Sequence, residues 1–427
     1  MKDKKYKLIT ISDHVMAPSG VGTQTRYIVD KLVSTGKFQI IALAGAIKHQ
    51  DYTPQKTQEW GDDVIIVPVD GYGNPAIIRQ LLDIEKPDAI WFMTDPRFYE
   101  WLWAIEDEIH QVCPLIYNHL WDENPFPKYN LPYYKSTDYI VCINKLTYNM
   151  LKENGISHCE YVPHGVPEKD FYPLEQNKIQ ELKTKHLSNE LKDSFIGFYN
   201  SRNALRKRTG NVMWAWKLFL DKLPEEERNN CVLALHTPPH DPEGQDLFKV
   251  AEMLDIRRHV AFNDKKVEPS VMNEFYNMAD FTVCLSSEEG FGLSSLESLM
   301  VGTPVISTRT GGLQDQNIDP DTGQEFGHSI KADAVSLIGS QRTPYIESHH
   351  VDPKTAADKI MDLYKKKKEL GAELYKETVA GKVARESVLR RFNLPKIQDR
   401  WVEIIEEQIE IFKQKQTEDK LVNLIAI

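Results

Sequence analysis

Short apolar runs alternate with longer amphipathic segments along almost the whole chain. The apolar runs are expected to form strands, at Lys7–Ser12, Phe38–Ala44, Val64–Pro68, Ala89–Met93, Leu115–Asn118, Tyr139–Ile143, Phe195–Tyr199, Val232–His236, Val260–Phe262, Phe281–Leu285 and Pro304–Ser307. The amphipathic segments are expected to form helices, at Gly22–Thr35, Pro75–Ile84, Lys145–Glu153, Asn177–Lys192, Thr209–Leu220, Asp246–Leu254, Pro269–Met278, Ser294–Val301, Thr355–Leu370 and Leu394–Lys413. This alternation is typical of βαβ units and predicts an α/β fold with parallel sheets.

The alternation is interrupted by a segment rich in proline and glycine between Val162 and Pro173. One set of strands and helices precedes this segment and a second set follows it, which indicates a linker between two Rossmann-like domains. The predicted domains cover residues 1–167 and 168–395. Ligands of open α/β sheets bind beyond the carboxyl ends of the strands. The cleft between the domains is therefore the expected site.

The composition of the chain indicates which classes of partner the protein binds and in which cell compartment it lies. The formal net charge is -11, which disfavours nucleic acid as a partner without excluding local basic patches. The 5 cysteines are scattered and contain no Cys-x-x-Cys pair, so free thiols in a reducing cytoplasm are expected. No stretch approaches the roughly 20 apolar residues that a transmembrane helix needs. We therefore expect a cytoplasmic protein without a membrane span.

The most specific segment runs from Ser287 to Glu297 and reads Ser-Glu-Glu-Gly-Phe-Gly-Leu-Ser-Ser-Leu-Glu. A glycine-containing loop joins a strand to a helix here, with Glu289 on the loop and Glu297 in the first helical turn. Exposed backbone N–H groups attract phosphate, and carboxylates accept hydrogen bonds from sugar hydroxyls. A structural alternative is a capping box, in which Glu297 serves the helix that begins near Ser294.

This segment, followed by Gly302-Thr-Pro-Val-Ile306, resembles the E-x7-E motif of the family-4 retaining glycosyltransferases with the GT-B fold. The resemblance implies two Rossmann-like domains facing a central cleft, the first completed by the C-terminal helix at 396–427. It further implies that the first domain binds the acceptor and the second a nucleotide-sugar donor. In this interpretation Glu289 faces the transferred sugar and Glu297 the ribose, and the donor-binding residues of the loop are Gly290, Phe291, Gly292 and Leu293.

Two further motifs fit the same family. Arg202 and Lys207 lie after a strand and before a helix, and they resemble the family's Arg-x4-Lys diphosphate clamp. Fixed cations stabilise a departing diphosphate and can replace a metal ion. Gly20 and Gly22 occupy a turn after the first strand that resembles the family's Gly-Gly-Val-Gly turn near the donor phosphates. Ser19 replaces one glycine of that turn, which predicts a stiffer loop.

Acceptor contacts are expected at the ends of two other strands. His119 stands where family members often hold a histidine near the reacting sugar, and structural hydrogen bonding is its alternative role. Asp95 and Arg97 lie among aromatic residues that are able to stack on a sugar. His164 is interpreted as a hinge residue.

Two patterns elsewhere bear a loose likeness to metal sites. His236 and His240 are separated by a pair of prolines, and Asp319-Pro-Asp321 lies in a turn, so both are interpreted as loops.

Together these residues predict a retaining, metal-independent glycosyltransferase that needs no cofactor. Its expected donor is a nucleotide-diphosphate sugar, UDP- or GDP-linked, and its expected acceptor is a saccharide, a lipid-linked sugar or a small molecule. An alternative is a phage-type enzyme that glycosylates a modified base in DNA. A non-catalytic nucleotide-sugar-binding protein is a further alternative.

Overall fold

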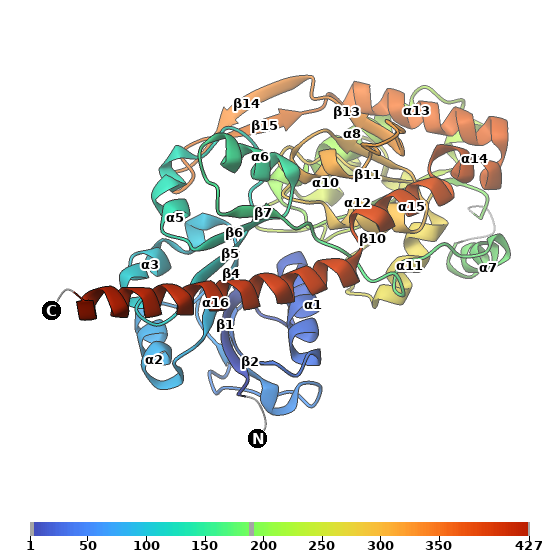
Figure 1. Cartoon of the computed structure of the whole chain (residues 1–427). Coiled ribbons are helices and arrows are strands. Elements are labelled where there is room, and N and C mark those ends of the chain that lie inside the picture. Colours follow the sequence, from blue (N-terminus) through green and yellow to red (C-terminus); the bar gives the residue numbers. More distant parts are fainter. Residues whose placement is uncertain (1–3, 188–191, 426–427) are drawn as a thin grey trace.

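A computed structural model describes residues 4–187 and 192–425, and these fold into two α/β domains (Figure 1). The first domain holds a seven-stranded sheet in the order β3-β2-β1-β4-β5-β6-β7. All its strands are parallel, and β1 pairs with β2 residue by residue from Tyr6 with Phe38 to Asp13 with Gly45. The strands are β1 (Tyr6–Asp13), β2 (Phe38–Gly45), β3 (Val64–Pro68), β4 (Ala89–Thr94), β5 (Leu115–His119), β6 (Tyr139–Cys142) and β7 (Cys159–Tyr161).

The second domain holds a six-stranded parallel sheet in the order β10-β9-β8-β11-β12-β13. Its strands are β8 (Phe195–Asn200), β9 (Cys231–His236), β10 (Val260–Asn263), β11 (Phe281–Cys284), β12 (Val305–Thr308) and β13 (Gly327–Ile330). The predicted α/β class with two parallel sheets is confirmed. The strands β7 and β13 were not predicted, because both are short edge strands with polar residues, which weakens the apolar signal.

Helices cover both faces of each sheet. In the first domain they are α1 (Gly20–Ser34), α2 (Pro75–Glu85), α3 (Glu100–Trp103), α4 (Glu106–Ile109), α5 (Leu131–Lys135) and α6 (Lys145–Glu153). After the linker they are α7 (Gln176–His186), α8 (Thr209–Leu220), α9 (Glu225–Arg228), α10 (Leu247–Met253), α11 (Pro269–Met278), α12 (Leu293–Met300), α13 (Pro353–Leu370), α14 (Ala372–Val379), α15 (Gly381–Arg391) and α16 (Leu394–Ile425). The expected helix at 177–192 ends at His186, and its residues 188–191 lie outside the described ranges.

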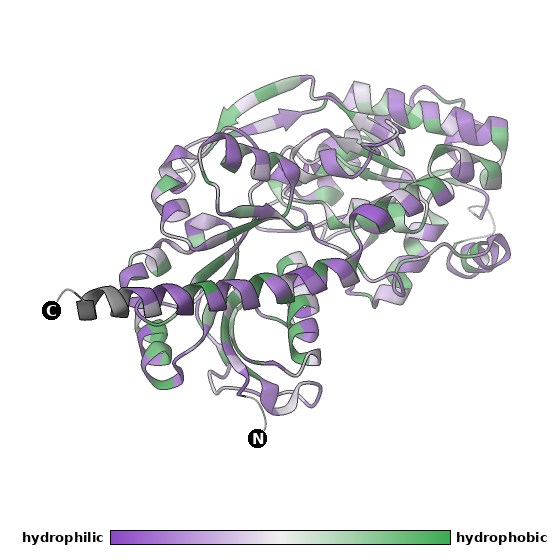
Figure 2. Cartoon of the chain, viewed as in Figure 1, coloured by the Kyte–Doolittle hydropathy of each residue, from purple (hydrophilic) through white to green (hydrophobic). Residues whose placement is uncertain are grey.

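The last helix, α16, packs on the first domain although it follows the second in sequence (Figure 1). Trp401, Ile405 and Ile409 are buried in one core with Leu8 of β1 and Trp91 of β4. Figure 2 shows hydrophobic and hydrophilic residues alternating along α16, which places an apolar stripe on the sheet side. The helix continues to Ile425 rather than ending at Lys413 as predicted, and residues 426–427 lie outside the description.

An antiparallel hairpin of β14 (Ala334–Ile338) and β15 (Ile346–His350) was not predicted. It belongs to the second half of the chain but reaches the first domain, where Glu347 N donates to Asn124 O over 2.7 Å. Tyr345 and Tyr129 pack edge to face with 5.0 Å between ring centroids. Every residue of β14 is exposed, although its sequence, Ala334-Val-Ser-Leu-Ile338, is largely apolar.

In the described part of the chain, none of the helices combines the length and apolar character needed to cross a bilayer.

Candidate active site

The carboxyl ends of the two sheets face each other across a cavity of about 820 Å³. Of the predicted site residues, nine line this cavity: Gly20, Arg202, Lys207, Glu289, Gly290, Phe291, Gly292, Leu293 and Glu297. Gly22 does not line it, because it lies inside the first turn of α1, where an added Cβ would be 2.8 Å from His14 O. The cleft predicted from the two sets of strands thus exists, and most of the expected donor residues meet in it.

The first-domain wall begins at the N-terminus of α1. Ser19 caps this helix, because its Oγ accepts from Gly22 N at 3.0 Å and donates to the Asp13 carboxylate. An added Cβ on Gly20 would lie 3.1 Å from Leu293 Cδ1 of the second domain. Because Gly20 has no side chain, the N-terminus of α1, which is the positive end of the helix dipole, comes close to the opposite wall of the cleft.

Glu289 is the most strongly held carboxylate in the cleft. Lys207 Nζ and Ser286 Oγ donate to Glu289 Oε2, the latter at 3.0 Å, and Arg206 Nη1 lies 3.5 Å from the same oxygen. Burial by itself raises the pKa of Glu289, but the charges of Lys207 and Arg206 outweigh it and lower this pKa to about 2. Glu289 is therefore ionised throughout the physiological range.

Arg206 is a site residue that the sequence analysis missed. It lies with Lys207 in a short 3-10 turn (Leu205–Lys207) after β8, and it donates to Glu288 O at 2.9 Å. Desolvation lowers the pKa of Arg206, and the charges of Asp122 and Glu289 more than offset this, so the pKa is raised overall. The adjacent charges in the sequence Arg206-Lys207-Arg208 were the available signal.

Arg202, the other half of the predicted clamp, is engaged elsewhere. Its Nε donates to Asp241 Oδ2 at 2.8 Å and its Nη1 lies 3.0 Å from Glu243 Oε2. The side chain keeps 56% of its surface exposed, so it has room to change rotamer. In this conformation Lys207 and Arg206, rather than Lys207 and Arg202, surround Glu289.

Glu297 is not part of a capping box, which corrects that alternative. The helix α12 begins at Leu293 after Gly292, whose φ of 90° suits glycine, and Glu297 follows in the second turn. Glu297 Oε2 accepts from Tyr276 OH at 2.6 Å, and Tyr276 OH accepts from Asn200 Nδ2 at 2.8 Å. Burial raises the pKa of Glu297 to about 7.

The expected acceptor residues do not line the cavity. His119 is 1% exposed, its Nε2 is 3.1 Å from Tyr134 OH, and burial lowers its pKa to about 3. Asp95 accepts from Arg97 N at 2.9 Å and starts a 3-10 turn (Pro96–Phe98). Burial raises the pKa of Asp95 to about 6 against the opposing charge of Arg97. The sequence placed these residues at the correct sheet edge, and the charges of Asp122 and Arg206 in the cavity act on the pKa of Asp95, whereas the His119 ring is directed toward Tyr134.

Other residues that line the cavity had been given different roles or none. Asp122 projects from the first domain, and His164, taken for a hinge residue, packs edge to face on Phe291 with ring centroids 5.2 Å apart. The far end of the cavity is formed by residues at the ends of β9 and β10, namely His236, Thr237, Pro238, Asn263, Asp264, Lys265 and Lys266. Strand-end residues of this kind become neighbours only through the sheet order.

One cluster beside the cleft has the composition of a metal site. Ligand atoms of Glu123, Glu347 and His349 lie within 4.8 Å of one another. Glu123 Oε2, however, accepts from Thr310 Oγ1 at 2.6 Å and Gly311 N at 2.8 Å, and Oε1 accepts two hydrogen bonds from Asn124. These four bonds occupy the carboxylate, so Glu123 joins the domains and is a poor metal ligand.

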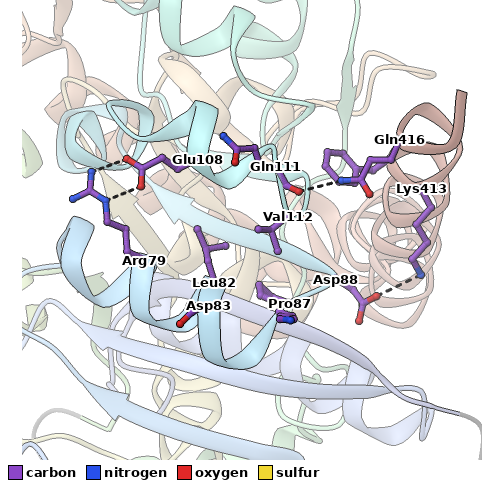
Figure 3. Close-up of a pocket in the computed structure, with 12 residues that line it drawn as sticks. Arg79, Leu82, Asp83, Pro87, Asp88, Glu108, Gln111, Val112, Lys413 and Gln416 are labelled. Atoms are coloured by element: carbon purple, nitrogen blue, oxygen red, sulfur yellow. Dashed lines mark hydrogen bonds and ion pairs between the residues drawn. The ribbon is translucent and has the colours of Figure 1, made fainter. Parts of the chain in front are cut away.

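A second cavity, the outer groove, lies on the far side of the first domain between α2, α4 and α16 (Figure 3). Arg79 makes two hydrogen bonds to Glu108 across one end of it, at 2.7 and 2.6 Å. Lys413 Nζ of α16 lies 3.4 Å from Asp88 Oδ1 at the other end. The Arg79–Glu108 pair joins α2 to α4, and the Lys413–Asp88 pair attaches α16 to the first domain. No predicted site residue lines this groove.

Residues 183–377 match the family "Glycosyl transferases group 1". The chain is 28% identical over 173 residues to the alpha-monoglucosyldiacylglycerol synthase of Streptococcus pneumoniae, covering 40% of this chain and 37% of that protein. It is 30% identical over 152 residues to the D-inositol 3-phosphate glycosyltransferase of Corynebacterium jeikeium, covering 36% of each. The chain thus matches little more than a third of the length of these curated relatives.

Solved structures resemble the chain over nearly its full length. The sucrose-phosphate synthase of Thermosynechococcus elongatus superposes with a TM-score of 0.69 at 15% identity, covering 94% of this chain and 99% of that one. Anabaena HepE in complex with UDP and glucose gives a TM-score of 0.63 at 11% identity, covering 94% and 100%. The fold is therefore GT-B, and the match to the glycosyl transferases group 1 falls on its second domain.

Proposed function

We propose that this protein is a metal-independent, retaining glycosyltransferase that uses a nucleotide-diphosphate sugar as donor. The observation that carries the proposal is the Lys207–Glu289 ion pair, with Arg206 beside it, in a cleft whose second wall lies in the segment that matches the glycosyl transferases group 1. A cation held next to an ionised carboxylate serves both parts of a nucleotide sugar. The cation suits the diphosphate, and the carboxylate suits the sugar hydroxyls.

In the proposed reaction the bond between the sugar and the β-phosphate breaks while the acceptor hydroxyl attacks the same face. The departing phosphate takes the proton of that hydroxyl. Lys207 and Arg206 stabilise its negative charge, Arg202 joins them after leaving Asp241, and the N-terminus of α1 contributes its backbone N–H groups. Stabilisation of the leaving group is the largest catalytic effect in this scheme. Glu297, in its ionised form, accepts hydrogen bonds from the ribose.

The proposed donor is UDP- or GDP-linked, and the proposed acceptor is a saccharide, a lipid-linked sugar or a small molecule. Support comes from relatives named for glycosyl transfer to D-inositol 3-phosphate and for synthesis of a glucosyldiacylglycerol, and from a structural neighbour described with UDP and glucose. The DNA-modifying alternative gains no support from these comparisons.

The test is a panel of UDP-, GDP- and ADP-linked sugars screened by thermal shift, followed by mass spectrometry of products on acceptor pools. We expect one nucleotide sugar to raise Tm, and its turnover to continue in the presence of EDTA. The anomeric configuration of the product, read by NMR, should match that of the donor. Failure of every nucleotide sugar to bind contradicts the proposal, loss of turnover with EDTA contradicts metal independence, and an inverted product contradicts retention.

A further inference from the structure

Asp122 lies three residues beyond His119, in the loop that follows β5, and is a first-domain residue lining the cavity. The residues around it are fixed in place. Trp121 Nε1 donates to Glu123 O at 2.6 Å, and the Glu123 carboxylate is bound by Thr310 and Gly311 of the second domain. The loop therefore presents Asp122 from a position that is determined by both domains.

Asn144 sets the distance between this loop and the loop Glu289–Gly292 of the second domain, called the glycine loop below. Its Nδ2 donates to Trp121 O at 3.0 Å and to Gly290 O at 2.7 Å, and the residue is fully buried. As a result, a Cβ added to Gly290 would lie 2.8 Å from Asp122 Oδ1. The Asp122 carboxylate thus touches the loop that carries Glu289.

Asp122 itself remains half-buried and available to a ligand. Within residues 4–187 and 192–425 its carboxylate has no hydrogen-bond or ion-pair partner, although Arg206, which lines the same cavity, is near enough for the charge of Asp122 to raise its pKa. A half-buried carboxylate without donors is costly unless a ligand or water supplies them. Its wall of the cavity faces Arg206, Lys207 and Glu289, so a ligand that contacts those residues also comes close to Asp122.

The charge of Asp122 selects which part of a ligand it contacts. A carboxylate repels phosphate, whereas it accepts strong hydrogen bonds from neutral hydroxyl groups. Glu289 on the opposite wall also favours neutral hydroxyl donors over phosphate. Arg206 and Lys207 offset the two negative charges. The space between Asp122 and Glu289 therefore suits a neutral, hydroxyl-rich sugar, with the phosphates held nearer to the cations.

We propose that Asp122 binds the transferred sugar of the donor by accepting a hydrogen bond from one of its hydroxyl groups, opposite Glu289. This inference rests on the proposed function. It assigns to Asp122 the sugar-facing position in the first domain that the sequence suggested for His119, whose ring is directed into the core against Tyr134.

The test compares the affinities for UDP and UDP-glucose, or GDP and GDP-mannose if the wild-type protein prefers them. Asp122→Ala and Asp122→Asn are measured by isothermal titration, with Asp83→Asn in the outer groove as the matched control (Figure 3). We expect Asp122→Ala to bind the nucleoside diphosphate like wild type but to bind the nucleotide sugar about 10- to 100-fold more weakly. Asp122→Asn should show a smaller loss, and slow hydrolysis of the nucleotide sugar should fall in parallel.

Equal weakening of nucleoside diphosphate and nucleotide sugar in Asp122→Ala would overturn the inference, because Asp122 would then act only by shaping the glycine loop. Unchanged binding of both also overturns it. Failure of the wild-type protein to bind any nucleotide sugar of the UDP-, GDP- and ADP-linked panel overturns the proposed function itself, and is recognised before any variant is compared.

Discussion

The two walls of the cleft come from similar α/β domains but offer different chemistry. The second-domain wall concentrates ionised and hydrogen-bonded groups, with Glu289, Lys207 and Arg206 in contact and Glu297 bound to Tyr276. The first-domain wall offers mainly close backbone approach at Gly20, apolar side chains such as Leu120 and Ile143, and the carboxylate of Asp122.

This difference indicates a division of labour. Apart from Arg202, which must leave Asp241, the second wall is built before a ligand arrives, because the charges of Glu289, Lys207 and Arg206 already hold one another in place. The first wall provides shape, a helix N-terminus and one carboxylate, so its specificity depends on which ligand fills the remaining space. Changes in the second wall should therefore affect any donor, and changes in the first should depend on the sugar.

The largest effect is expected for Lys207. Lys207→Met should lower turnover about 100- to 1,000-fold because the leaving phosphate loses its nearest cation. It should also destabilise the fold by on the order of 3 kcal/mol, because the buried Glu289 carboxylate loses its closest cation and keeps only Arg206 and Ser286. Adding Glu289→Gln should restore stability, measured by thermal unfolding, without restoring turnover. Recovery of turnover in the double variant would mean that the cation is not required.

A smaller effect on turnover is expected for Arg206 and Arg202, and it should differ between the two. Arg206→Ala should lower turnover about 10- to 100-fold, because Arg206 already lies in the cleft beside Glu289, whereas Arg202→Ala should cost less than about 10-fold. Steady-state kinetics of both variants, with Arg79→Ala in the outer groove as control, measure the difference. The reverse order would show that Arg202 leaves Asp241 and becomes the principal diphosphate ligand.

Glu297 should give the unliganded protein a dependence on pH. Its pKa in the folded protein, about 7, lies above its ordinary value of 4.5, so the stability that it contributes is present at low pH and is lost as pH rises through 7. The Tm of Glu297→Gln relative to wild type should therefore increase between about pH 5 and 8.

Nucleotide affinity provides a second measurement on Glu297. Wild-type affinity should rise over the same pH range, because the ionised carboxylate is the better acceptor for ribose hydroxyls, and the affinity of Glu297→Gln should stay flat. Parallel pH profiles of wild type and variant would assign the titration to another group.

The smallest effect on turnover is expected at His119. His119→Leu should leave turnover within about 3-fold of wild type, yet lower stability by about 1–3 kcal/mol, because the buried Tyr134 hydroxyl loses its partner. Chemical denaturation and kinetics on the same preparation separate the two effects. A loss of turnover beyond 10-fold at normal stability would mean that His119 contacts the ligand from the first-domain wall. The contrast between the two walls would then be weaker.

Much of the second wall was predictable because its residues lie in two short motifs that follow β8 and β11, which are adjacent strands of the sheet. Glu289 and Glu297 lie in one loop and the helix after it, and Lys207 lies in the turn after β8, so their meeting needs only the parallel sheet. The first wall was harder to predict. His119 and Asp122 are three residues apart, and which of them reaches the cavity depends on packing against Tyr134 and on the contacts of Glu123 with the second domain.

By itself, the sequence determined the two parallel sheets, the cleft between them and the charged loops on its second wall. Periodicity and short motifs specify these features locally. Only the tertiary structure decided that Arg206 rather than Arg202 adjoins Glu289, that Glu297 pairs with Tyr276, and that Asp122 rather than His119 faces the cavity. The physical reason is that the direction of a side chain at a strand end is set by the groups packed around it. Those groups come from segments distant in the sequence.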